Sequence, residues 1–379
     1  MSVPVLAPRR ILSRLLEQQG AILIEQRRAW RRVLRAPGVL RTALGTRVGT
    51  TPRDVVFREG TLSLLRYRRR TPATYAEPVL FCYALVNRPY ILDLQPGKSV
   101  VERYLERGFD VYLIDWGVPS HDDRGLTLDD YVSGRLARVV DFVLRERGRE
   151  RLHLLGYCMG GTLSALYTAL QPRKVETLTL LAAPIDFSGK ESLLHVWTNR
   201  RSFDVDTLID VHGNCPAEFL QTCFLSMRPV QNLLEKNISF LENFDDSRFL
   251  SSNFAMETWV NDNIPVAGAT FRQFVHKLYQ NNELVRGEFE LGQQRVDLEQ
   301  IRCPLLLLTA DKDHLVVPTS TRGICRHVGS REVDELRIDA GHVGLVVSSK
   351  AHKTLWPAAT RWLAERSSPS ASLLSPTLS

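Results

Sequence analysis

Long apolar runs are missing from this sequence of 379 residues. No run approaches the roughly 18 apolar residues that a membrane-spanning helix needs, and no apolar segment near the start is typical of a secretory signal. We therefore expect no transmembrane segment.

Paired cysteines and clustered histidines are missing as well. The six cysteines, at positions 82, 158, 215, 223, 303 and 325, form no CxxC pair, and the nine histidines are spread out with no HExxH. This spacing indicates a reducing, cytoplasmic setting without a disulfide framework. It also lacks the ligand spacing of metal sites, so we expect no metal and no other cofactor.

Lysine is absent from the first 50 residues, which contain ten arginines and two glutamates. This segment has a net charge of +8, and because the whole chain carries +7, the remainder is close to −1. Its apolar residues recur at helical spacing, which predicts an amphipathic N-terminal arm over residues 1–50 that suits an anionic or apolar surface or a partner helix. Alternatives are a helix packed on its own core and a transit peptide. No nucleic-acid-binding motif occurs, so we expect no nucleic acid partner.

From residue 51 onward, strand-like and helix-like segments alternate. Strands are predicted at 62–67, 78–83, 110–115, 151–155 and 177–182, and helices at 99–106, 131–147 and 159–170. This alternation predicts a mostly parallel sheet with helices on both faces over residues 51–184.

The alternation lapses over residues 185–298, where aromatic-rich helical stretches such as FRQFVHKLYQ dominate. We interpret this segment as an inserted helical cap; the alternative is a packing subdomain with no role in gating. The second part of the core follows over 299–366, with strands at 303–310 and 334–339 and a helix near 353–365. The Ser/Pro-rich residues 367–379 are predicted to be a disordered tail.

A cysteine stands between glycines in GYCMGG, residues 156–161. Gly156 and Gly160 flank Cys158 in the spacing of the nucleophile elbow, a sharp turn from strand to helix that exposes its central residue. The backbone amide of Met159 would point at a developing oxyanion. The alternative is a small buried cysteine beside a glycine-rich turn.

Partners for this cysteine occur where an α/β-hydrolase fold places its acid and its base, after the last strands and in the order nucleophile, acid, histidine. Asp313 follows the strand at 303–310, and His342 follows the strand at 334–339. Asp311 is better placed to stabilise the turn. His314 is a competing base, although a hydrogen bond within its own loop is the simpler role.

A second oxyanion donor should come from the loop after the strand at 78–83. The backbone amide of Val86 is our candidate. The alternative is an ordinary turn capped by Asn87.

Seven segments, in order along the chain, resemble the polyhydroxyalkanoate synthases, most closely the class III catalytic subunit. They are YALVNRPYILDL (83–94), DVYLIDWG (110–117), LTLDDY (126–131), GYCMGG (156–161), FRQFVHKLYQNN (271–282), DHLVVP (313–318) and GHVGLVVSSKA (341–351). The resemblance covers roughly residues 50 to 366.

The resemblance implies Cys158 as nucleophile, His342 as its activator and Asp313 as the acidic residue whose carboxylate helps to deprotonate the incoming hydroxyl. It further implies an α/β-hydrolase core with a mobile cap and the polymerisation of (R)-3-hydroxyacyl-CoA, with 3-hydroxybutyryl-CoA the expected substrate. The implied partners are the growing polyester chain, the surface of cytoplasmic granules, a second copy of the chain and a helper subunit.

The sequence departs from the family pattern in three places. Met159 stands where short synthases usually have glutamine, which bears on rate or chain-length preference. DHLVVP has one residue more before its proline than expected, and the first 50 residues match no segment of the family that we can place.

Two other functions stay open on the sequence alone. A thioesterase or dienelactone-hydrolase-like enzyme can carry the same three residues and would release free acid. A non-catalytic granule-coating protein would use the basic arm and not Cys158.

Overall fold

The computed structural model describes residues 38–39, 41–189, 193–201, 203–226, 243 and 246–370. Contacts divide these residues into two units. One contains residues 38–47 and 243–257, and the other contains residues 48–226 and 258–370. Residues 243–257, in the middle of the predicted helical cap, group with residues 38–47, and the cap stays a prediction.

The larger unit is built on an eight-stranded sheet with the order β1-β2-β6-β3-β7-β8-β11-β12. Strands β1 and β2 pair antiparallel with each other, β2 pairs antiparallel with β6, and the remaining neighbours are parallel. The strands are β1 (Arg53–Glu59), β2 (Leu62–Tyr67), β3 (Val79–Cys82), β6 (Val111–Asp115), β7 (Leu152–Tyr157), β8 (Val175–Leu181), β11 (Leu305–Ala310) and β12 (Val333–Ile338). This arrangement confirms the predicted mostly parallel sheet.

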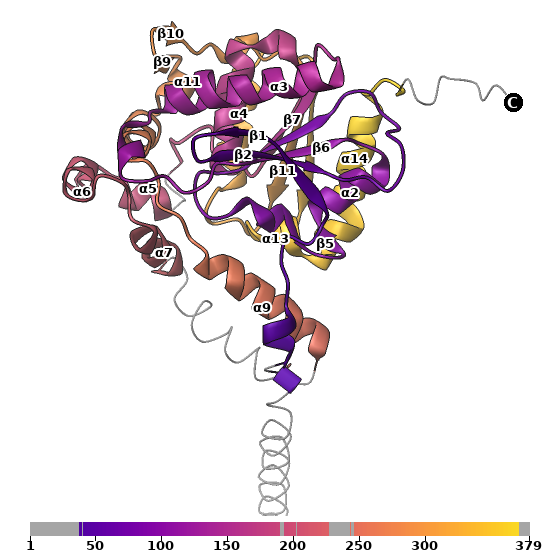
Figure 1. Cartoon of the computed structure of the whole chain (residues 1–379). Helices are drawn as coiled ribbons and strands as arrows, with labels where there is room; N and C mark the ends of the chain where they lie inside the picture. The colour runs from indigo at the N-terminus through magenta and orange to yellow at the C-terminus, as the bar shows by residue number, and fades with distance from the viewer. Residues whose placement is uncertain are drawn as a thin grey trace, which may run out of the picture. The chain divides into compact units, whose positions relative to one another are not determined.

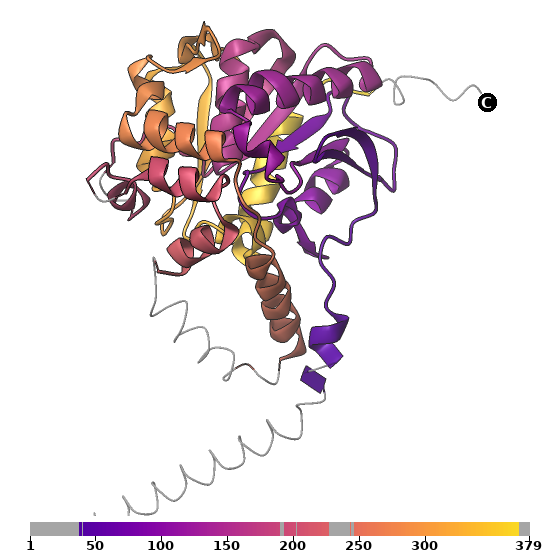
Figure 2. The ribbon, with the colours of Figure 1, turned by 60° about the vertical axis from the view of Figure 1, so that its left-hand side comes forward.

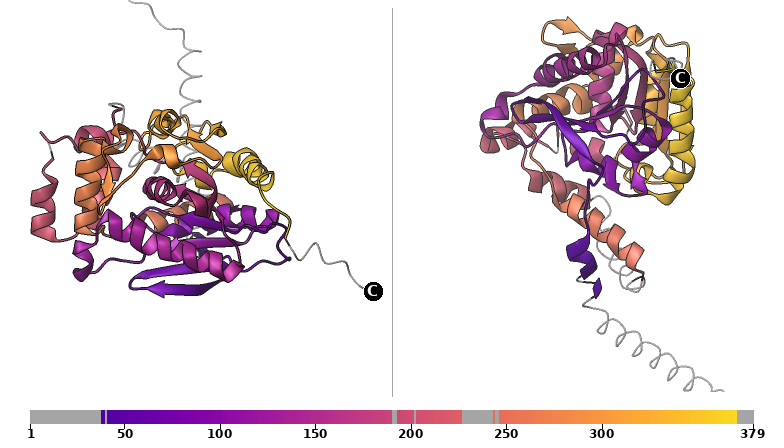
Figure 3. Two further views of the ribbon diagram at one scale, coloured as in Figure 1. Left: turned by 90° about the horizontal axis from the view of Figure 1, so that it is seen from above. Right: turned by 45° about the vertical axis from the view of Figure 1, so that its right-hand side comes forward.

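Helices cover both faces of the sheet (Figures 1 and 3). Helices α3 (Ala137–Arg147) and α4 (Met159–Leu170) lie on one face, and α2 (Val100–Arg107) packs with α14 (Trp356–Ala364) on the other. The central strands β3, β7 and β11 are buried along their whole length. Strands covered on both faces have continuous apolar sequences, which is why LHLLGY and LLLLTA are apolar almost throughout.

Short helices between β8 and β11 gather on one side of this core (Figure 2). They are α5 (Leu193–Trp197), α6 (Val205–His212), α7 (Ala217–Ser226), α10 (Gly268–Gln273), the π-helical segment η6 (Phe274–Gln280) and α11 (Glu283–Arg286). A two-stranded ribbon of β9 (Glu290–Leu291) and β10 (Gln294–Arg295) follows them. The segment in which helical stretches were predicted to dominate thus also contains one small β-ribbon.

The remaining elements are short, apart from α9 (Ser247–Asn261). They are the strands β4 (Asp93–Gln95) and β5 (Lys98–Ser99), the helices α12 (Pro318–Arg322) and α13 (Gly344–Val347), and the turns η1 (Pro89–Leu92), η2 (Asp122–Gly125), η4 (Pro172–Lys174), η7 (Leu298–Gln300) and η8 (Gly323–Arg326). Two further π-helical segments are η3 (Asp130–Leu136) and η9 (Ala351–Leu355). Within the described residues, no helix is both long enough and apolar enough to cross a membrane.

The structure describes only part of the predicted N-terminal arm and of the predicted C-terminal tail. Most of the arm predicted for residues 1–50 lies outside the described residues, although 38–39 and 41–45 are helical. Residues 367–370, assigned from their composition to a disordered tail, instead pair with the chain near Tyr75. The backbone amide of Ala76 donates to Ser368 and that of Ser370 donates to Thr74, both at 2.9 Å. These bonds hold the segment in place despite its Ser/Pro-rich sequence.

Candidate active site

Cys158 occupies a strained turn between β7 and α4. Its backbone has φ 54° and ψ −129°, a region that non-glycine residues rarely adopt and that costs about 1–3 kcal/mol. The flanking glycines make the turn possible, because a Cβ on Gly160 would lie 2.2 Å from the carbonyl oxygen of Cys82 and one on Gly156 would lie 2.4 Å from Gly161. The predicted elbow geometry is confirmed.

Asp313 lies in the loop between β11 and α12 and is buried. Its Oδ1 accepts hydrogen bonds from the backbone amides of Leu315 and Val316, each at 2.9 Å. Its Oδ2 lies 2.7 Å from Nδ1 of His342. Asp311 is exposed and pairs with Arg337, so the structure brings Asp313, and not Asp311, to the histidine.

His342 follows β12 and is buried over the elbow. Its ring stacks on Tyr157, the last residue of β7, with ring centroids 5.1 Å apart. The Tyr157 hydroxyl also donates to the backbone carbonyl of His342 at 3.3 Å. Both the backbone and the ring of His342 are therefore fixed by the residue that directly precedes Cys158.

The charge state of His342 is set by opposing effects. Burial alone would lower the pKa of His342, but attraction to the charges of Asp313 and Cys158 and hydrogen bonds to both side chains raise it to about 10. Asp313, His342 and Cys158 thus form one electrostatically connected group. An imidazolium in this position stabilises a neighbouring thiolate, which is the reactive form of cysteine.

The two predicted oxyanion donors lie on the elements that sequence reasoning assigned. Met159 is the first residue of α4, where backbone amides have no partner within the helix. Val86 lies in the loop between β3 and η1. The end of β3 lies against the elbow, since Gly160 meets Cys82 and Tyr83 at close range. The donor roles of both amides stay predictions.

His314, the competing base, lies next to Asp313 in the same loop and is half-buried. The ring that is hydrogen-bonded to Asp313 is that of His342. This geometry favours His342 as the base.

Three tyrosines lie near the nucleophile and were not among the predicted site residues: Tyr83 and Tyr157 are buried and Tyr279 is half-buried. Burial raises the pKa of Tyr83, Tyr157 and Tyr279 above its ordinary value, and the charge of nearby Cys158 raises it further. All three stand in segments that resemble the polyhydroxyalkanoate synthases, and Tyr157 directly precedes Cys158. These positions were the available signals.

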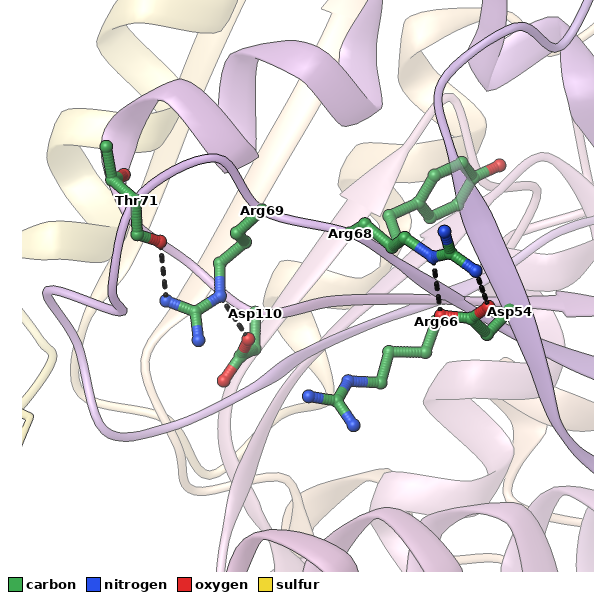
Figure 4. A pocket seen from close by; sticks show the side chains of 7 residues that line it. Asp54, Arg66, Arg68, Arg69, Thr71 and Asp110 are labelled. Carbon is green, nitrogen blue, oxygen red and sulfur yellow. Dashed lines mark hydrogen bonds and ion pairs between the residues drawn. The ribbon is translucent and has the colours of Figure 1, made fainter.

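A second hollow lies away from Cys158 (Figure 4). It measures about 380 Å³ and is lined by Asp54, Arg66, Tyr67, Arg68, Arg69, Thr71 and Asp110. Arg68 pairs with Asp54, and Arg69 pairs with Asp110 at 2.5 Å. Asp110 directly precedes β6, whereas Cys158 follows β7, so the hollow lies at the opposite end of the parallel strands from Cys158.

Comparisons with known proteins agree with this geometry. The chain matches the alpha/beta hydrolase fold family over residues 77–348. It also matches the family described as the N-terminus of poly-beta-hydroxybutyrate polymerase (PhaC) over residues 31–105. The second match reaches into the first 50 residues, where sequence reasoning placed no resemblance.

Several curated relatives share a common description, poly(3-hydroxyalkanoate) polymerase subunit PhaC. The relative from Haloferax mediterranei is 44% identical over 320 residues, which cover 84% of this chain and 65% of that protein. Those from Allochromatium vinosum and Synechocystis are 42% and 40% identical over 84% of this chain, and the matches cover 90% and 86% of their lengths. The chain thus spans about two thirds of the first relative and nearly all of the other two.

Solved structures show a likeness of fold. A monoacylglycerol lipase from Paleococcus ferrophilus is 16% identical, with a TM-score of 0.50, over 80% of this chain and 99% of that chain. At this identity the likeness supports the α/β-hydrolase fold alone.

Proposed function

This chain belongs to the poly(3-hydroxyalkanoate) polymerase family, and from that premise we propose that it polymerises (R)-3-hydroxyacyl-CoA into polyester with release of CoA. The favoured substrate in this proposal is 3-hydroxybutyryl-CoA. The observation that carries the proposal is the hydrogen-bonded pair of Asp313 and His342 beside an elbow cysteine.

Acylation begins with Cys158. Its thiolate attacks the thioester carbonyl, and the oxyanion that forms is stabilised by the backbone amides of Met159 and Val86. The bond from carbon to the sulfur of CoA then breaks, and CoA leaves with a proton from His342. A cysteine thioester is close in energy to the thioester it replaces, so the acyl group stays activated, whereas a serine ester would not.

Chain growth uses the hydroxyl of the next 3-hydroxyacyl-CoA. This hydroxyl attacks the acyl group on Cys158, an ester bond forms, the cysteine thiolate leaves, and the hydroxyl proton passes to His342. The lengthened chain, now on CoA, acylates Cys158 again and releases that CoA.

Asp313 has a narrower role in this scheme than the family resemblance implies. One carboxylate oxygen accepts two backbone amides and the other binds His342. With both oxygens occupied, Asp313 orients the imidazole and stabilises its charge. We therefore assign removal of the hydroxyl proton to His342.

Polymerisation outcompetes hydrolysis only where water is kept from the acyl group. Aromatic rings of Phe187, Phe274 and Tyr279 pack together, with Phe187 and Tyr279 centroids 4.8 Å apart and Phe187 and Phe274 centroids 5.9 Å apart. The charge of Cys158 acts on Tyr279. These rings are the device that we propose excludes water.

Release of CoA from 3-hydroxybutyryl-CoA, combined with analysis of the product, tests the proposal. We expect insoluble polyester from the wild-type chain and no CoA release from Cys158→Ala. Free acid as the sole product would establish a thioesterase-like hydrolase instead. Unchanged CoA release by Cys158→Ala would leave the cysteine without a catalytic role, whereas no CoA release by either chain would favour the granule-coating alternative.

The partners in this proposal follow from the chemistry and from the family. The polymer is insoluble, so the enzyme works at the surface of a polyester granule in the cytoplasm. The relatives are described as subunits, which fits a second copy of the chain and a helper subunit. CoA arrives bound to the substrate, so the reaction needs no separate cofactor.

A further inference from the structure

A small cavity lies beside the proposed reaction centre. It has a volume of about 20 Å³, and its walls include Pro184, Phe187, His195, Tyr279, Leu315 and Val316. This volume holds about one water molecule or one hydroxyl group.

The cavity wall approaches the catalytic group of Asp313, His342 and Cys158 at two places. The backbone amides of Leu315 and Val316 hold the carboxylate of Asp313. Tyr279 is close enough to Cys158 for the charge of the sulfur to act on it. The cavity is therefore next to the place where an acyl group on Cys158 would react.

Two polar residues of the cavity wall, Asp186 and Ser320, are paired with protein groups. The Asp186 carboxylate accepts from Ser188 and Asn282, each at 2.9 Å, and the Ser320 hydroxyl donates to the Asp186 carbonyl at 2.6 Å. Nδ1 of His195 is buried and has no hydrogen-bond partner among the described residues. An unpaired buried polar atom destabilises the folded chain, and a ligand atom in the cavity would remove that penalty.

We propose that Nδ1 of His195 binds the C3 hydroxyl of the 3-hydroxyacyl-CoA substrate. This inference rests on the proposed function, because only a hydroxyacyl substrate carries that group. The hydroxyl is attached two carbons from the thioester carbonyl, so it reaches an adjacent cavity while the carbonyl meets Cys158. A hydroxyl both donates and accepts, and therefore pairs with either tautomer of a neutral histidine.

Three variants separate this role from a structural one. His195→Phe keeps a flat ring and removes the polar atom, His195→Asn keeps a hydrogen-bonding atom near the position of Nδ1, and His195→Gln places one near that of Nε2. The measured quantity is the rate constant for release of the first CoA per enzyme molecule. It is compared between 3-hydroxybutyryl-CoA and butyryl-CoA, which lacks the hydroxyl.

We expect His195→Phe to lower the rate with 3-hydroxybutyryl-CoA by roughly 10- to 100-fold and to leave the rate with butyryl-CoA within about twofold. His195→Asn should retain more of the lost rate than His195→Gln. Equal losses with both substrates, or no loss with either, would overturn the proposal. A wild-type chain that releases no CoA from 3-hydroxybutyryl-CoA, or makes only free acid, would instead contradict the proposed function itself.

Discussion

Tyr157 contacts His342 in two ways. Its ring stacks on the imidazole with centroids 5.1 Å apart, and its hydroxyl donates a hydrogen bond to the histidine backbone carbonyl. The residue next to the nucleophile in sequence thus positions the base that comes 184 residues after that nucleophile. This contact ties β7 directly to the loop after β12.

Tyr157→Phe should keep the stack and remove the hydrogen bond. A single hydrogen bond contributes about 0.5–1.5 kcal/mol, so we expect CoA release to fall about two- to tenfold. Tyr167→Phe is the matched control, because the Tyr167 hydroxyl is buried without a partner among the described residues. Equal effects of the two substitutions on CoA release would show that the Tyr157 bond does not position His342.

Asp313→Asn should lower kcat for CoA release by about 10²- to 10⁴-fold. The amide still accepts from the Leu315 and Val316 backbone, but it no longer stabilises an imidazolium at His342. Asp311→Asn changes an exposed carboxylate in the same loop and should leave kcat within about twofold. The reverse order of effects would make Asp311 the acid of the site.

The raised pKa of His342 predicts a pH-dependent stability. Its pKa lies at about 10 in the folded chain against 6.5 for an ordinary histidine, so protonation stabilises the fold fully below about pH 6.5. That contribution declines as the pH rises and is lost above about pH 10. The gap in free energy of unfolding between the wild type and His342→Gln should therefore narrow from pH 6.5 to pH 10 in urea titrations. A gap that stays constant over this range would contradict the proposed charge state.

Gly160→Ala should destabilise the fold and abolish activity. The added Cβ would lie within 2.6 Å of backbone atoms of Cys82 and Tyr83, which cannot move without shifting β3. Overpacking of this kind costs about 1–3 kcal/mol or more. Gly125→Ala is the control, since a Cβ there meets no atom within 4 Å. Similar unfolding free energies for the two variants would show that the elbow tolerates a side chain.

Much of the core could be predicted from the sequence because local pattern and tertiary role agree there. The strand at 62–67 and the helix at 159–170 were predicted with the bounds that the structure shows. Strand β1 was missed because it lies at the edge of the sheet and is mostly exposed, and its sequence RDVVFRE has only three apolar residues between charged pairs.

The parts of the site that depend on long-range contacts could not be predicted in the same way. Cys158, Asp313 and His342 follow strand ends in a recognisable order, so sequence placement sufficed to nominate them. His195 and Tyr279 come from helices between β8 and β11. No local motif marks His195, and Tyr279 is one of several aromatic residues in FRQFVHKLYQNN. Their place beside the elbow emerges only when those helices fold over the sheet.

Mass spectrometry of the intact chain, quenched soon after mixing with 3-hydroxybutyryl-CoA, shows whether Cys158 carries the growing acyl chain as a thioester. We expect one or more hydroxybutyryl units attached through a thioester that maps to the peptide of Cys158, together with released CoA. We expect neither with Cys158→Ala. Release of CoA by Cys158→Ala, or an acyl group mapped to another residue, would contradict this role of Cys158.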